Sequence, residues 1–172
     1  VEKRRLAVET LGAALAEGRA AIEHDFHENR RPGHETARRL AALTDVIVSA
    51  AFRFAADGLH RLPIRTTGER LAMVAVGGYG RGEMAPFSDV DLRVLTPPKG
   101  TAWAESVVET TLYILWDLKM KVGHATRSAA ECVRRATGDI TIRTALVERR
   151  LIAGDEALAD ELSQRLWNDL FD

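Results

Sequence analysis

The sequence has 172 residues, 46% of them hydrophobic, which fits one ordinary domain, or a domain with a helical extension, around a real core. Its 24 basic and 25 acidic residues are interleaved and give a formal net charge of −1, which argues against a nucleic-acid-binding face or a membrane-binding surface. The single cysteine, Cys132, excludes an internal disulfide framework, and no apolar stretch is long enough to span a bilayer. Because a signal-peptide pattern is absent, a cytoplasmic location is expected, and the first residue, Val1, indicates a piece of a longer protein.

Two helices are predicted at the start of the chain. Residues 3–29 and 35–56 both carry apolar side chains at helical spacing, and Pro32 lies in the break between them. The two helices are expected to pack as an antiparallel pair. We therefore assign residues 1–65 to an N-terminal helical extension and residues 66–172 to the domain that follows it.

A strand is predicted at residues 71–76, and a turn rich in glycine follows it. Residues without Cβ can take a positive φ and bring backbone N–H groups close to an anion. The turn is therefore a candidate cradle for a triphosphate, to which Arg81 would add a forked cationic contact and Ser88 a hydroxyl group. The glycines concerned are Gly77, Gly78, Gly80 and Gly82.

Two aspartates accompany the second predicted strand, residues 90–96. Asp89 and Asp91 are two residues apart, so on an extended backbone both carboxylates project from one face, roughly 7 Å apart, while Val90 and Leu92 point into a core. Carboxylates this close repel each other unless a cation lies between them, and hard oxygen ligands suit Mg²⁺ that carries substrate phosphates. The two aspartates are therefore the candidate catalytic and metal-binding residues.

Two other interpretations of this segment compete with a triphosphate site. Gly80-x-Gly82-x-x-Ala85 fits the dinucleotide-binding fingerprint, but Pro86 argues against the helix that this fingerprint requires. The other is a structural turn beside two solvated aspartates. Against it, Asp91 lies within an otherwise apolar strand, where a carboxylate needs a partner.

A third strand is predicted at residues 119–127, after a helix at residues 103–117, and its orientation relative to the first two strands is left open. Arg127, at the end of this strand, is a candidate for binding the nucleotide phosphates. Lys119 and Lys121 are weaker candidates for the same role.

Three helices are predicted after the third strand. The pattern Ser128-x-x-Glu131 is a capping box that begins the first, which is expected to reach about Arg135. Residues 139–151 form the second, and a last amphipathic helix follows Gly154. Several other residues are expected to be structural. They are Cys132, His124, Trp103, Trp116 and Trp167.

The motifs described above carry a family resemblance. Val76-Gly77-Gly78, ten intervening residues and Asp89-Val90-Asp91-Leu92 resemble the signature of the DNA polymerase β-like nucleotidyltransferase superfamily. A longer, dispersed pattern over about residues 70–167 resembles the N-terminal domain of the bacterial PII uridylyltransferases. Its parts are Gly77 to Glu83, Pro86, Ser88 to Leu92, Leu115 to Leu118, Val122 to His124, Glu131-Cys132 and Glu148 to Asp155.

The resemblance implies a fold, a reaction and partners. The fold would be α+β, a polymerase β-like core with a small mixed sheet flanked by helices and preceded by the helical pair. The reaction would be the Mg²⁺-dependent transfer of UMP from UTP to a tyrosine hydroxyl of the PII signalling protein, with release of pyrophosphate. Glutamine would regulate the complete enzyme through regions outside these 172 residues, and the uridylyl-removing activity would also lie outside them.

One departure from the superfamily pattern leaves the mechanism open. Members commonly have a third carboxylate on a later strand, but the third predicted strand here has none. Asp117, Asp139 and Glu148 stay open as its replacement. Two alternative functions also stay open: adenylyl transfer to a protein or small molecule, because the motif reads triphosphate and metal but not uracil, and a degenerate module that senses nucleotide or binds a partner.

Overall fold

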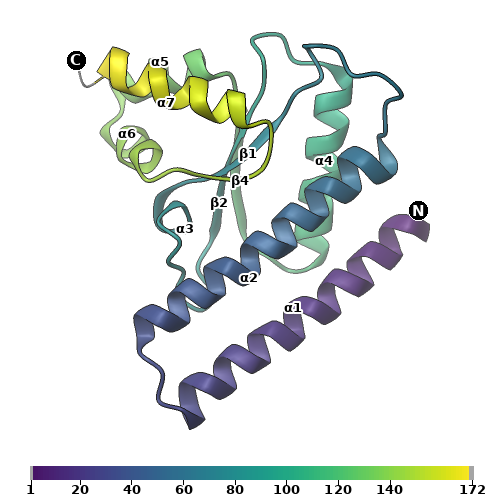
Figure 1. The fold of residues 1–172 in the computed structure, drawn as a ribbon, viewed down its shortest axis with the longest axis vertical. Helices are drawn as coiled ribbons and strands as arrows, with labels where there is room; N and C mark the ends of the chain where they lie inside the picture. Colours follow the sequence, from purple (N-terminus) through teal and green to yellow (C-terminus); the bar gives the residue numbers. More distant parts are fainter. Residues whose placement is uncertain (1, 171–172) are drawn as a thin grey trace.

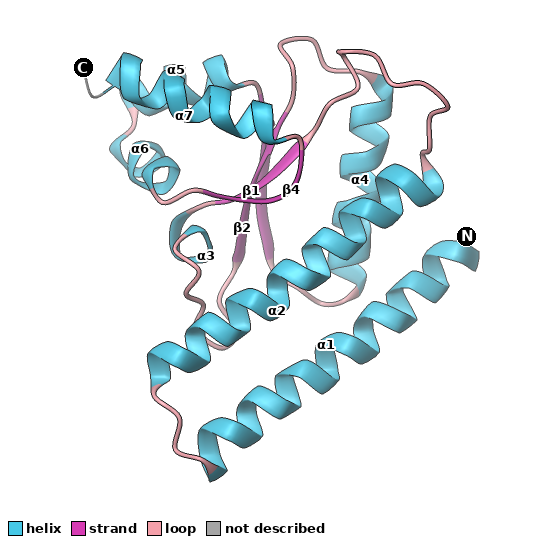
Figure 2. Cartoon of the chain, viewed as in Figure 1, coloured by secondary structure: helices cyan, strands magenta, loops and turns pink. Residues whose placement is uncertain are grey.

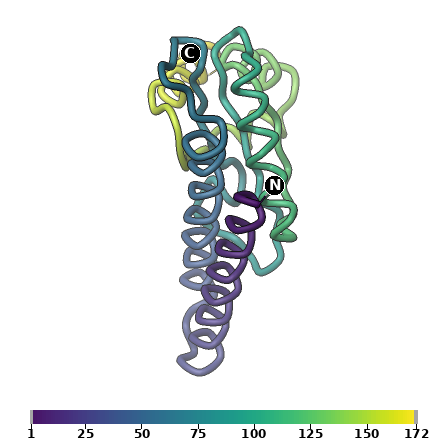
Figure 3. Tube along the Cα trace, turned by 90° about the vertical axis from the view of Figure 1, so that its right-hand side faces the viewer, coloured from purple at the N-terminus to yellow at the C-terminus, as the bar shows by residue number. Residues whose placement is uncertain are grey.

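Two long antiparallel helices begin the chain. The computed structural model describes residues 2–170, and in it α1 (Glu2–Glu28) and α2 (Gly33–Arg53) lie side by side, as Figures 1 and 3 show. The predicted helical pair is therefore confirmed. The helical backbone does not end at residues 57–58 as expected but continues from α2 as a π-helical turn, η1 (Phe54–Leu59), whose Ala55 and Ala56 are buried in the core.

A four-stranded mixed sheet forms the centre of the molecule (Figure 2), in the order β3-β2-β1-β4. β1 pairs antiparallel with both β2 and β4, whereas β2 and β3 are parallel. Parallel neighbours need a crossover connection, which α4 (Ala102–Asp117) provides. The α+β fold class with a small mixed sheet is therefore confirmed. The strands are β1 (Ala72–Ala75), β2 (Val90–Leu95), β3 (Val122–Arg127) and β4 (Arg150–Gly154).

Different helices pack on the two faces of the sheet. Val90, Leu92 and Val94 of β2 are buried in a core shared with α2 and α4. The opposite face, to which Leu95 belongs, packs against α5 (Ala129–Gly138), α6 (Ile140–Val147) and α7 (Glu156–Leu170), which lie together on the other side of the sheet from α2 in Figure 1. Because side chains alternate along a strand, Asp91 projects on the same face as Leu95.

The helix predicted at residues 139–151 is too long. α6 ends at Val147, and the chain then forms β4, which pairs with β1. This strand was missed because its partner is about 75 residues away in the sequence, and the short apolar run of β4 is compatible with helix or strand until that partner is known. The capping box at Ser128 is confirmed, since its hydroxyl accepts from the Glu131 amide and the Glu131 carboxylate accepts from the Ser128 amide.

The expectation that all three tryptophans anchor the core is wrong for two of them. Trp116 is 42% exposed and Trp167 is 65% exposed. Both lie on outward faces of their helices, and the Trp116 ring packs edge-on against Tyr113 instead. Trp103 does pack against the core, and its indole N–H donates to the His60 carbonyl at 2.7 Å. Among the described helices, none combines the length and the apolar character that crossing a membrane requires.

Candidate active site

Asp91 lies in a gap that two glycines leave open. It is paired in register with Gly123 of the parallel strand β3, and a Cβ at residue 123 would be 2.6 Å from Asp91 Oδ1. On the other side, a Cβ at Gly77 would be 3.9 Å from Asp91 Oδ2. The structure therefore brings the glycine turn and this aspartate together, and only a residue without Cβ at position 123 leaves its carboxylate where it is.

The two aspartates repel each other. Asp91 has a raised pKa, first because burial penalises its charge and second because the Asp89 carboxylate is close, while Arg93 acts in the opposite direction. A cation between the carboxylates would relieve this repulsion. The described residues contain no cluster of three or more histidine, cysteine or acidic side chains that could hold a metal. Two carboxylates with coordination positions left over fit Mg²⁺, which keeps waters or substrate phosphates as its other ligands.

The glycine turn is a single short helix, α3 (Gly77–Gly80), with left-handed residues at its ends. Gly77 has φ of 61° and Gly82 has φ of 74°, conformations that favour glycine. The Gly80 amide donates to the Val76 carbonyl, so it is used within the turn. The amides of the first turn, at Gly77 and Gly78, are the ones without an acceptor inside a helix.

Gly80 has a packing contact that accounts for its residue type. A Cβ there would be 1.6 Å from the Glu148 carbonyl oxygen, which is backbone that cannot rotate away. Its neighbour Tyr79 is buried, and the Tyr79 carbonyl accepts a hydrogen bond from Arg150 at 3.1 Å. Arg150 also binds both carboxylate oxygens of Asp45 on α2, at 2.5 and 3.2 Å. The turn is thereby tied to β4 and to the helical pair.

The polar side chains predicted around the turn are partly engaged elsewhere. Arg81 donates to the Glu148 carboxylate at 2.6 Å, on an exposed surface. The Ser88 hydroxyl donates to the Ala85 carbonyl at 2.9 Å, which leaves its oxygen as an acceptor. Phe87, directly before Ser88, is 90% exposed and has a positive φ of 67°, so this loop has a strained backbone.

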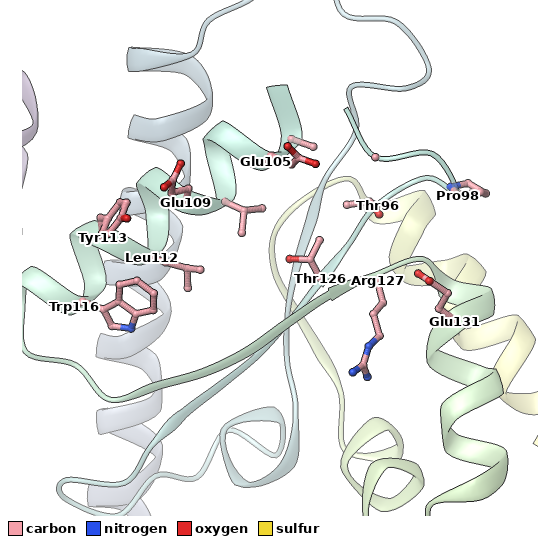
Figure 4. A pocket seen from close by; sticks show the side chains of 13 residues that line it. Thr96, Pro98, Glu105, Glu109, Leu112, Tyr113, Trp116, Thr126, Arg127 and Glu131 are labelled. Carbon is pink, nitrogen blue, oxygen red and sulfur yellow. The ribbon is translucent and has the colours of Figure 1, made fainter. Parts of the chain in front are cut away.

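Arg127 lies on the same face of the sheet as Asp91. Its register partner is Leu95, and residues paired across neighbouring strands share a face. Figure 4 shows its side chain leaving β3 on the side away from Trp116. His124, by contrast, contacts the Trp116 ring at 6.0 Å and belongs to the α4 side. Arg127 thus joins the acidic face, and His124 does not.

The three replacements considered for the third carboxylate all have other partners. Asp117 pairs with Arg4 of α1 at 2.5 Å. Asp139 accepts from the first amides of α6 as its N-cap, and Glu148 pairs with Arg81. Each of these three carboxylates therefore has a structural partner away from the acidic pair.

A cavity of about 520 Å³ lies between α4 and the ends of β2 and β3 (Figure 4). Its lining includes Tyr113 and Trp116 together with Thr126, which projects toward α4. The acidic pair does not line it. Arg127 does line it, so the cavity adjoins the candidate active site at Arg127.

Arg93 is the residue that the sequence analysis missed. It lies two residues after Asp91 on β2, so the same alternation that placed the aspartates on one face also placed Arg93 there. The signal was present in the sequence, but a single arginine between Leu92 and Val94 carries no motif.

The sequence of this chain is similar to a known domain family and to known proteins. A family profile described as a nucleotidyltransferase domain matches residues 64–152. Proteins described as bifunctional uridylyltransferase/uridylyl-removing enzymes are similar over most of this chain: that of Cereibacter sphaeroides is 52% identical over 98% of it, and that of Ruegeria pomeroyi 53% identical over 90%. The same name belongs to a protein of Phenylobacterium zucineum, 52% identical over 98% of the chain.

The match covers only part of these relatives. The chain spans 18% of the Cereibacter and Phenylobacterium proteins and 17% of the Ruegeria protein. The family profile, in contrast, covers more than half of this chain and includes the glycine turn and both aspartates. The chain therefore belongs to the nucleotidyltransferase domain family, a family of enzymes that transfer nucleotidyl groups.

Proposed function

We propose that this chain transfers UMP from UTP to a tyrosine hydroxyl of a PII signalling protein and releases pyrophosphate. The observation that carries the proposal is the position of Asp91, beside Asp89 and between the Cβ-free positions 77 and 123. The choice of a uridylyl group is supported by the names of the relatives, which are uridylyltransferases, and the choice of the PII protein follows the family resemblance of the sequence motifs.

Asp89 and Asp91 would hold Mg²⁺, whose charge, when bound, polarises the α-phosphate and stabilises the negative charge that develops there. The two carboxylates would hold the metal, and with it the α-phosphate, at the start of β2. The backbone amides of Gly77 and Gly78, with Gly80 and Gly82 shaping the turn, would bind phosphate oxygens on the Asp91 side.

Three polar side chains would complete the nucleotide site. Arg127 shares the face of Asp91, so it would bind phosphate oxygens directly. Arg81 would have to exchange its Glu148 partner for a phosphate, and the Ser88 hydroxyl would have to leave the Ala85 carbonyl to donate. Both of the latter contacts would therefore form only when nucleotide is bound.

The test is transfer of label from UTP to PII protein in the presence of Mg²⁺. We expect the wild type to label the acceptor, and the Asp89→Ala and Asp91→Ala variants to fall at least about a hundredfold, as is typical when a charge-stabilising group is removed from the transition state. Asp169→Ala, which removes an exposed carboxylate from α7, is the matched control and should label like the wild type. Equal labelling by all four proteins would refute the proposed roles.

Two further arms of this experiment separate the alternative functions. Label transferred from ATP but not from UTP would indicate an adenylyltransferase. Binding of UTP in the presence of Mg²⁺ without any transfer would favour a degenerate module that senses nucleotide, which agrees with the other partners found for Asp117, Asp139 and Glu148.

A further inference from the structure

Charged and small side chains share one face of β2 and β3 beyond the acidic pair. The register places Gly123 beside Asp91, Ala125 beside Arg93 and Arg127 beside Leu95, all on one face of the sheet. On the other side of β2, Arg93 is paired with Val74. Arg93 and Arg127 therefore follow Asp91 along this face. The β3 residues beside Asp91 and Arg93 are a glycine and an alanine.

Arg93 is partly buried and lacks a partner. Its Nε atom is buried without a hydrogen bond, and no ion pair holds its guanidinium group within residues 2–170. A partly buried guanidinium group is ordinarily paired with an acceptor, so the guanidinium group of Arg93 is available to an anion.

The acidic residues nearby do not supply that anion. The charge of Asp91 acts on Arg93 over a distance, but no ion pair joins the two residues within the part of the chain that the structure describes. Glu131 interacts with Arg127 over a distance, but its carboxylate accepts from the Ser128 amide and hydroxyl in the capping box. Two cations thus lie on one face of the sheet without an ion-pair partner within residues 2–170.

We propose that Arg93 and Arg127 form an anion subsite that binds phosphate oxygens of the nucleotide beyond the acidic pair. The identity of the nucleotide rests on the proposed function, but the subsite does not. The guanidinium fork matches two phosphate oxygens at once, and a partly desolvated site strengthens such charge-assisted bonds. Gly123 and Ala125, beside Asp91 and Arg93 on β3, carry at most a methyl group, so no large side chain of β3 lies between the two arginines and the acidic pair.

The experiment is calorimetric titration of the metal-free protein, in EDTA, with inorganic tripolyphosphate. We expect Arg93→Met and Arg127→Met each to weaken binding about tenfold or more, since a hydrogen bond to a charged group is lost. Arg93→Lys should fall between Arg93→Met and the wild type, because it keeps the charge but not the fork. Arg61→Met changes the net charge equally at an exposed position and should stay within about twofold of the wild type.

Two readouts distinguish a subsite from a merely structural arginine. Without ligand, Arg93→Met should melt at or above the wild-type temperature, because an unpaired buried charge is removed, and tripolyphosphate should raise the melting temperature of the wild type only. Asp91→Asn should bind tripolyphosphate more tightly in EDTA, because a repelling carboxylate is neutralised. If Arg93→Met does not fold, Arg93→Lys and Arg127→Met decide the question.

Three results would overturn the proposal. They are a wild type that does not bind tripolyphosphate, an Arg93→Met variant that binds it as the wild type does, and Arg93-dependent binding of the dicarboxylate glutarate without binding of tripolyphosphate, which would assign the subsite to a carboxylate. None of these measurements uses UTP or PII protein, so loss of polyphosphate binding and failure of uridylyl transfer are separate outcomes.

Discussion

Gly123→Ala should disable the acidic pair and leave the fold intact. The new Cβ would be 2.6 Å from Asp91 Oδ1, whereas ordinary contacts begin at 3.4 Å, so the carboxylate oxygen must retreat by about 0.8 Å. A displacement near 1 Å of a group that positions the reaction costs up to about a hundredfold in rate. We therefore expect kcat for uridylyl transfer to fall about tenfold to a hundredfold, equivalent to about 1.4–2.7 kcal/mol of transition-state stabilisation.

The stability of the Gly123→Ala variant should change little. The atom that must move is the end of a rotatable side chain and not backbone, and alanine is favoured over glycine in a strand by about 0.5–1 kcal/mol. The melting temperature should therefore stay within about 4 °C of the wild type. A separate calorimetric titration with Mg²⁺ should show about tenfold weaker binding than the wild type, because the second carboxylate is turned away.

The control is Gly100→Ala, where an added Cβ meets no atom within 4 Å. It should match the wild type in transfer rate, Mg²⁺ affinity and melting temperature. Wild-type kcat and Mg²⁺ affinity in Gly123→Ala would refute the argument that the Asp91 carboxylate must stay beside residue 123. So would a large loss of stability, because then the backbone, and not the carboxylate, would have yielded.

Three further variants probe the glycine turn and the charges around it. Gly80→Ala places a Cβ 1.6 Å from the Glu148 carbonyl oxygen, so it should lower the free energy of unfolding by about 3 kcal/mol or more in urea titrations. Asp91→Asn should raise the melting temperature at pH 7 without metal. The pKa of Asp91 is raised in the folded state, so its charge destabilises the folded protein at any pH above that pKa. The gain in melting temperature should therefore vanish as the pH falls through the folded-state pKa toward the ordinary aspartate value. Asp45→Ala leaves Arg150 without its carboxylate and should cost about 1–3 kcal/mol of unfolding free energy.

Each of these predictions has its own control and its own contradiction. Gly138→Ala adds a Cβ that meets no atom, so Gly80→Ala must be clearly less stable than it in urea. A gain in melting temperature for Asp91→Asn that is the same at acid and neutral pH would show that relief of charge is not its cause. An Asp45→Ala variant as stable as the wild type would mean that Arg150 finds another acceptor.

Local sequence patterns were sufficient to predict the acidic pair and the face of the sheet to which Asp91 belongs. Alternation along residues 90–96 placed Asp91 opposite the buried Leu92, and the structure agrees. The same reasoning would have identified Arg93, because two-residue spacing alone decides the face. The predicted division of the chain at residue 65 is not tested by this structure and stays a prediction.

The sequence patterns could not predict contacts between segments that are far apart in the chain. Gly80 was read as part of a phosphate cradle because of its neighbours, while its contact with the Glu148 carbonyl joins residues far apart in the chain. The first two residues of β4, Arg150 and Leu151, were predicted as the end of a helix for the same reason, since the pairing of β4 with β1 decides its conformation. Helical periodicity likewise cannot tell whether Trp167, on the last helix, lies against the core or outward.

The helical pair is structurally part of the site. The Met84 amide, just after the glycine turn, donates to the Ala37 carbonyl of α2 at 3.1 Å, and Arg150 joins Asp45 of α2 to the Tyr79 carbonyl in the turn. These bonds hold the glycine turn at Tyr79 and the chain just after the turn at Met84. A displacement of α2 relative to the sheet would therefore move the turn while Asp91, fixed by β2 and β3, stays in place. The distance between the turn and the acidic pair thus depends on the packing of helices that carry no candidate catalytic residue.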